Sequence, residues 1–168
     1  AAEHAPEVTG GGDRVSLSRP TGKKLGPELK AGPARVTVSA VRPVLFGLRE
    51  AAASATRDIE VRLTPPQLAV LSSFHYINHG GAEFVVYSAT PADVDSGVRV
   101  GDETYPGFPA SGAGIRGDQG TRVAVFALLH DQDLNAPISL YARDAAGNEA
   151  SMPLDHTPFA KSFARSRI

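Results

Sequence analysis

The chain has 168 residues, 42% of them hydrophobic, which is enough to bury a core in one ordinary domain or two small ones. Seventeen basic residues balance eighteen acidic ones, and the formal net charge of -1 argues against binding to nucleic acid or to an anionic membrane surface. The chain has no cysteine, which excludes disulfides, thiol catalysis and cysteine-ligated zinc, and no apolar run approaches the ~20 residues of a membrane span.

The first third of the chain predicts a flexible segment followed by a β module. Residues 1–13 are small, polar and glycine-rich, as in a flexible N-terminal segment. Between residues 14 and 63 the sequence alternates with period two: Val36 and Val38 share one face, and Ile59 and Val61 share another. We expect a small or incomplete β module here, in which these apolar residues face inward. Within it, "LFGLREAAASAT" (Leu45–Thr56) is compatible with either a short helix or a long loop.

The next segment predicts an antiparallel β-sandwich over residues 64–153. "TPP" at Thr64–Pro66 interrupts the strand pattern and suits a junction between modules, because proline removes backbone donors. Four strand-like runs follow: "QLAVLS", "EFVVYSA", "TRVAVFALL" and "PISLYARD". The middle two are apolar on both faces, which favours central strands. The fold class expected is therefore all-β, with two modules in tandem.

The stretch "YARDAAGNEA" predicts a hairpin near the end of the sandwich. Asp144, Gly147 and Asn148 are residues that cap turns or accept left-handed backbone, and Ala150 and Met152 resume an inward face. The stretch also resembles the hairpin that joins the last two strands of many bacterial immunoglobulin-like domains, so the sandwich is expected to be immunoglobulin-like.

The long connection "DETYPGFPASGAG" contains the candidate binding residues Tyr105 and Phe108. Aromatic side chains on a stiff, proline-rich backbone lose little entropy when a partner binds. Alternatively, both rings fold back and cap the open end of the sandwich.

Two further clusters suggest metal binding, but each has a simpler interpretation. His75, His79 and Glu83 are spaced by four, yet residues four apart on an extended strand lie ~13 Å apart, too far for one ion. Asp131 and Asp133 in "HDQDLNAP" resemble the start of a calcium loop, but the required glycine is missing. We therefore interpret the first cluster as packing around a turn and the second as a polar connection, and we assign no metal site and no catalytic residue.

A wider resemblance covers roughly residues 33–168. The strings "TPPQLAVLSSFHYINHGGAEFVVYSATPADVDSGVRVGDETYPGFPASGAG", "VAVFALLHD", "ISLYARDAAGNEA" and "FAKSFARSRI", in this order, resemble the non-catalytic N-terminal region of bacterial lysostaphin/LytM-type zinc metallopeptidases. That family binds zinc through an H-x-x-x-D pair and an H-x-H pair. None of the five histidines here (His4, His75, His79, His130 and His156) has either spacing.

The resemblance implies that this chain is not itself an enzyme but an extracytoplasmic accessory region. Such a region would space, dock or restrain a peptidoglycan peptidase domain lying beyond the C-terminus, and only that domain would bind zinc. The expected location is the periplasm or cell envelope, with the parent protein anchored in the membrane. The expected partner is the peptidase domain itself or another cell-envelope protein. An alternative is a free-standing adhesin or carbohydrate-binding module, which would present a solvent-facing aromatic platform.

Residues 154–168 are expected to form a connecting tail. Phe159 and Phe163 are four residues apart and are too apolar to remain in water at no cost, so they are candidate interdomain contacts. Within this chain, Phe159 is expected to dock on the sandwich, and the segment after Phe163 to be loosely held.

We predict that this chain alone neither binds zinc tightly nor cleaves peptidoglycan, because the required ligand spacings are missing. Zinc content after dialysis and the turbidity of a cell-wall suspension check this. Stoichiometric zinc together with clearing of the suspension would contradict it.

Overall fold

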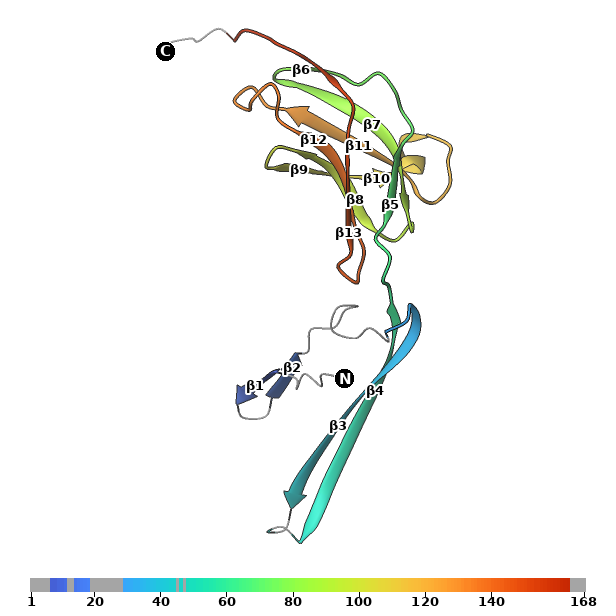
Figure 1. Cartoon of the computed structure of the whole chain (residues 1–168), viewed down its shortest axis with the longest axis vertical. Coiled ribbons are helices and arrows are strands. Elements are labelled where there is room, and N and C mark those ends of the chain that lie inside the picture. The colour runs from blue at the N-terminus through green and yellow to red at the C-terminus, as the bar shows by residue number, and fades with distance from the viewer. Residues whose placement is uncertain (1–6, 12–13, 19–28, 45, 47, 164–168) are drawn as a thin grey trace. The chain divides into compact units, whose positions relative to one another are not determined.

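The computed structural model describes residues 7–11, 14–18, 29–44, 46 and 48–163, and the chain divides into two units, residues 1–63 and 64–168 (Figure 1). The division falls beside Pro65 and Pro66, which lack the N–H group that a continuing strand ladder needs. The two units differ in how they bury their apolar side chains.

The described residues of the first unit form two antiparallel hairpins. The short hairpin pairs β1 (Glu7–Gly11) with β2 (Arg14–Ser18), and the long one pairs β3 (Gly32–Val44) with β4 (Arg49–Val61). Each long strand has 13 residues, and the register runs without interruption from Gly32 opposite Val61 to Val44 opposite Arg49. The prediction of an all-β chain is confirmed in this unit.

The helix or long loop expected for Leu45–Thr56 is wrong, because residues 49–56 belong to β4. Ala51–Ala55 have high helix propensity, but propensity is a weak term that neighbouring strands readily override. Here each of these four alanines and the one serine pairs with a residue of β3, from Val38 opposite Ala55 to Arg42 opposite Ala51. The pairing partner therefore decides the structure of this segment.

The buried face expected between residues 14 and 63 is not found on the long hairpin. Val36, Val38 and Ile59 are 45%, 46% and 42% exposed. The opposite side has the polar pairs: Arg35 Nε donates to Asp58 Oδ1 at 2.7 Å, and the Thr37 and Thr56 hydroxyl oxygens are 3.3 Å apart. The hairpin is amphipathic as the alternation indicates, but within this structure its apolar side faces solvent.

The second unit is a sandwich of two four-stranded antiparallel sheets (Figure 1). The first sheet has the order β10-β11-β7-β5 and is formed by β5 (Gln67–Val70), β7 (Gly81–Thr90), β10 (Phe108–Pro109) and β11 (Thr121–Leu128). The second has the order β13-β12-β8-β9 and is formed by β8 (Asp95–Val100), β9 (Glu103–Pro106), β12 (Ile138–Arg143) and β13 (Glu149–Pro153). A 3-10 helix, η2 (Ala110–Ala113), lies between β10 and β11.

This strand order is that of an immunoglobulin-type sandwich. β5, β7, β11 and β10 take the places of strands A, B, E and D, and β8, β12 and β13 those of strands C, F and G. β9 adds one strand beside C. The prediction of an antiparallel β-sandwich is confirmed.

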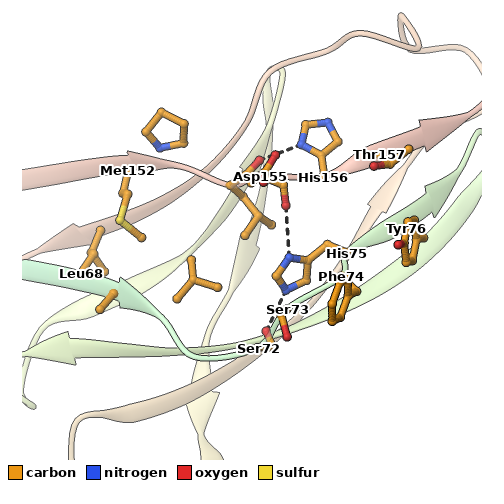
Figure 2. Close-up of a pocket in the computed structure, with 14 residues that line it drawn as sticks. Leu68, Ser72, Ser73, Phe74, His75, Tyr76, Met152, Asp155, His156 and Thr157 are labelled. Carbon is orange, nitrogen blue, oxygen red and sulfur yellow. Dashed lines mark hydrogen bonds between the residues drawn. The ribbon is translucent and has the colours of Figure 1, made fainter.

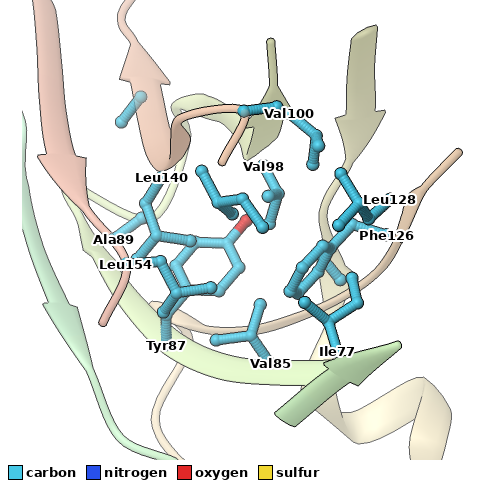
Figure 3. Close-up of a cluster of buried hydrophobic side chains, with 14 of the residues drawn as sticks. Ile77, Val85, Tyr87, Ala89, Val98, Val100, Phe126, Leu128, Leu140 and Leu154 are labelled. Carbon is cyan, nitrogen blue, oxygen red and sulfur yellow. The ribbon is translucent and has the colours of Figure 1, made fainter. Parts of the chain in front are cut away.

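The core between the two sheets is built around Tyr87 and Phe126, which come from neighbouring strands of the first sheet (Figure 3). Immunoglobulin domains of antibodies fasten their sheets with a disulfide packed against tryptophan, but this chain has neither cysteine nor tryptophan. Here the Tyr87 hydroxyl lies 2.9 Å from the Ser96 hydroxyl of β8 and so bridges the two sheets. Burial raises the pKa of Tyr87, and the hydrogen bond to Ser96 opposes that rise. A Cβ atom on Gly107 would overlap the Tyr87 hydroxyl, so this approach requires glycine.

The predicted hairpin is confirmed, with residues 144–148 connecting β12 to β13. The buried Asp144 carboxylate accepts hydrogen bonds from the backbone N–H groups of Ala146 and Asn148, both at 2.9 Å. Gly147 has a φ of 85°, the left-handed conformation that the sequence predicts for this turn. The turn therefore depends on one carboxylate and one glycine.

The chain stays attached to the sandwich beyond Pro153, where the connecting tail is expected to begin. Leu154 is buried in the core, and β14 (Thr157–Phe159) pairs in parallel with β6 (Tyr76–Asn78). The expected loose segment comprises residues 164–168, which lie outside the described residues.

Replacing Gly147 with valine should destabilise the fold by ~1–2 kcal/mol, because a β-branched residue is strained at this φ. No atom lies within 4 Å of a Cβ built on Gly147, so the cost would come from the backbone alone. Urea denaturation measures it. Gly112→Val is a matched control, since its Cβ also meets nothing within 4 Å and its φ is not positive. Equal stability of the two variants would contradict the turn geometry.

Candidate functional site

The outer face of the first sheet is unusually apolar for the surface of a sandwich. Along β7, Val85 and Tyr87 point into the core, so alternation directs Phe84 and Val86 outward. Along β11, Phe126 points inward and Val125 outward, where Val125 is 61% exposed. Both central strands thus carry large apolar side chains on both faces.

The register brings these outward side chains together across the sheet. Phe84 lies directly opposite Val125, Val86 lies opposite Val123, and Val123 also pairs with Phe108 of β10. Leu71, which follows β5, donates its backbone N–H to the Val86 carbonyl at 2.9 Å. We call this surface the apolar sheet face; it consists of Leu71, Phe84, Val86, Phe108, Val123 and Val125.

The apolar sheet face contains no charged side chain. By strand alternation, the other outward positions of β5, β7 and β11 are Gln67, Ala69, Ala82, Ser88, Thr90, Thr121 and Ala127. Leu71 and Phe108 are 57% and 59% exposed. An antiparallel sheet with one solvated face normally alternates apolar with polar residues, so this uncharged outer face is a candidate interaction surface.

The two predicted binding residues, Tyr105 and Phe108, are placed differently. Phe108 projects from the edge strand of the apolar sheet face. Tyr105 packs against the core, and its hydroxyl donates to the Ala127 carbonyl at 3.1 Å. The sequence pattern therefore located one residue of the surface and missed its centre, Phe84 and Val125. These two residues could have been found from the two predicted strands that are apolar on both faces, because one of those faces must lie outside the core.

The two predicted interdomain residues, Phe159 and Phe163, contact the sandwich itself. The Phe159 ring lies 5.9 Å from that of Tyr76. Phe163 stands edge-on to His79 and His130, at 5.5 and 5.8 Å, and its ring covers Gly80. The C-terminal segment is thus seated on β6 and on the turn that follows it.

A second candidate surface is a groove where the edge strands β5 and β13 face each other (Figure 2). It has a volume of about 650 Å³. Leu68, Val70 and Met152 line its apolar part, and residues 72–76 and 155–157 complete its walls. This volume is within the range of small-ligand sites.

His75 holds the two walls of the groove together. Its Nδ1 lies 3.2 Å from the Asp155 carbonyl oxygen, and its Nε2 lies 2.8 Å from Ser72 Oγ (Figure 2). A carbonyl oxygen can only accept a hydrogen bond, so the proton is assigned to Nδ1, which donates to it. Nε2 then has no proton and accepts from the Ser72 hydroxyl. Ser72 Oγ in turn accepts from the Val86 N–H at 2.9 Å. The arrangement is a structural clamp between residue 155 and β7.

The residues considered as metal ligands have protein partners in the structure. His79 Nε2 lies 3.0 Å from the Gln132 carbonyl oxygen. The Asp133 carboxylate accepts the Asn135 N–H at 2.8 Å, in the connection between β11 and β12. Within the described ranges, no group of three or more histidine, aspartate or glutamate side chains is placed to hold a metal ion.

Comparison with known proteins finds no protein-family model and no curated protein that matches the sequence. In the part of the chain that the structure describes, no helix has the length and hydropathy needed to cross a membrane.

Val125→Lys should change the free energy of unfolding by less than ~0.5 kcal/mol, because exposed positions tolerate charge. Val123→Lys, two residues earlier on the same side of β11, should destabilise the fold by ~2 kcal/mol or more, because Val123 is 8% exposed and an ammonium group cannot be buried unpaired. Urea denaturation followed by tyrosine fluorescence measures both. A large loss of stability in Val125→Lys would show that this face is already packed within the chain.

Proposed function

We propose that this chain is a non-catalytic extracytoplasmic accessory region that docks and positions a peptidoglycan metallopeptidase domain lying beyond its C-terminus. The observation that carries the proposal is the uncharged apolar sheet face. The resemblance of residues 33–168 to the N-terminal region of lysostaphin/LytM-type peptidases supplies the expected partner.

Energetics supports a docking role for this face. Apolar surface costs ~25 cal/mol per Å² when it stays in water, and a two-layer sandwich needs only one buried face on each sheet. Phe84 and Val125 face each other on the outer side, where they add nothing to the core between the sheets. A neighbouring domain that covers them would recover this free energy. Depletion of charge and enrichment of aromatic residues are also features of interface centres.

The C-terminal segment supports a positioning role. Thr157 donates its N–H to the His75 carbonyl, and His79 donates its N–H to the Phe159 carbonyl, both at 2.9 Å. The rings of Phe159 and Phe163 add contacts on either side of these bonds. A domain joined after this segment would leave the sandwich from a fixed place, which limits where it can dock.

The proposal predicts that the coding sequence after Ile168 specifies an H-x-x-x-D pair followed by an H-x-H pair. In the complete polypeptide, Val125→Lys should release the peptidase domain from the sandwich, because a lysine there would be desolvated at the interface. Small-angle scattering and limited proteolysis between the domains detect the release.

Val41→Lys is the matched control, since Val41 is also 61% exposed but lies on the long hairpin. The proposal would be contradicted by a stop codon directly after Ile168, or by a following domain that lacks the H-x-x-x-D and H-x-H pairs. Identical behaviour of the Val125→Lys and Val41→Lys variants would also contradict it.

A further inference from the structure

Three aromatic side chains project beside the groove between β5 and β13. Phe74, Tyr76 and Phe159 are 80%, 50% and 48% exposed. Phe74 and Tyr76 are themselves part of the groove wall, and Figure 2 shows His75, the residue between them in the sequence, turned toward Asp155. Phe159 extends this wall, because its ring lies against that of Tyr76 with an interplanar angle of 32°.

Phe74 combines two unfavourable features. Its φ of 61° lies in the left-handed region, which a bulky residue rarely adopts, and its ring stands in water. The clamp of His75 to Ser72 and Asp155 fixes the neighbouring backbone on both sides of the groove. A strained residue held in place by surrounding bonds is a recurrent feature of ligand sites.

The polar groups of the groove define the ligand that it suits. The lining contains hydroxyl groups of Ser73 and Thr157, the exposed Asp155 carboxylate and the His156 imidazole. His156 Nδ1 is bonded to the Leu154 carbonyl at 2.7 Å, which directs the ring. No lysine or arginine is among the described residues that line the groove. An anionic ligand would find no lysine or arginine to pair with here. A neutral ligand with hydroxyl groups and apolar faces could form hydrogen bonds with the polar groups and pack against the aromatic rings.

We propose that this groove binds a neutral oligosaccharide. The apolar C–H face of one pyranose ring stacks on Tyr76 and Phe159, and that of a neighbouring ring stacks on Phe74. Hydroxyl groups on the ring edges bond to Asp155 and Thr157. The groove is open to solvent and not an enclosed cavity, so a glycan chain can enter it from the side. This inference does not rest on the docking role proposed for the apolar sheet face.

The test is a titration of the intact chain with chitotetraose, followed by amide chemical shifts and calorimetry. Saturable shifts are expected at residues 72–76 and 155–159. Tyr76→Ala should weaken binding about five- to tenfold, the usual size of one lost aromatic contact. Phe108→Ala removes a comparably exposed aromatic ring from the apolar sheet face and should leave the affinity unchanged.

Phe74→Asn separates binding from folding. Asparagine tolerates left-handed backbone, so this variant should melt no lower than the wild type, yet bind chitotetraose at least about threefold more weakly. Absence of shifts up to about 10 mM sugar, near the limit of measurable affinity, would overturn the inference. So would shifts confined to the apolar sheet face, full affinity in Tyr76→Ala, or binding of an apolar peptide in the groove without binding of the sugar.

Discussion

Side chains on a β-strand alternate between two faces, and a two-layer sandwich buries only one of them. In this chain the central strands β7 and β11 place apolar side chains on both faces. The inner set surrounds Tyr87 and Phe126 and holds the sheets together. The outer set has Phe84 and Val125 at its centre, and these two side chains are 38% and 61% exposed. The stability of the second unit and the candidate docking surface therefore arise from the same two strands.

The fold of the second unit could be predicted from short-range patterns. The inward alternation of Ile138, Leu140 and Ala142, followed by a turn with Asp144 and Gly147, specifies a hairpin locally, and the structure has it at the predicted residues. Prediction failed where distant partners decide the outcome. Residues 51–55 are a strand because of β3, and Leu154 is in the core because the chain after β13 still follows β12, where the Leu154 N–H donates to the Ile138 carbonyl. In both cases the local sequence does not reveal the distant strand that decides the structure of the segment.

The candidate site was predictable only in part, for a related reason. Phe108 attracts attention because it stands among prolines and glycines, whereas Phe84 and Val125 look like ordinary core residues. Assigning them to the outside requires the sheet order and the count of layers, which only the three-dimensional structure supplies. The clamp of His75 to Ser72 and Asp155 was missed because residue 155 is eighty positions away from His75.

The parallel pairing of β14 with β6 has a mechanical consequence. Tension applied to the chain beyond Phe163 would pull β14 along its own axis, because β14 runs in the same direction as the strand that holds it. Two hydrogen bonds join the ends of β14 to the β6 segment, from the Thr157 N–H to the His75 carbonyl and from the His79 N–H to the Phe159 carbonyl. Both bonds would then be loaded together in shear instead of opening one after another. Such an attachment resists a steady pull better than a peeling edge does. The pairing of β14 with β6 would therefore keep the C-terminal segment attached to the sandwich under tension.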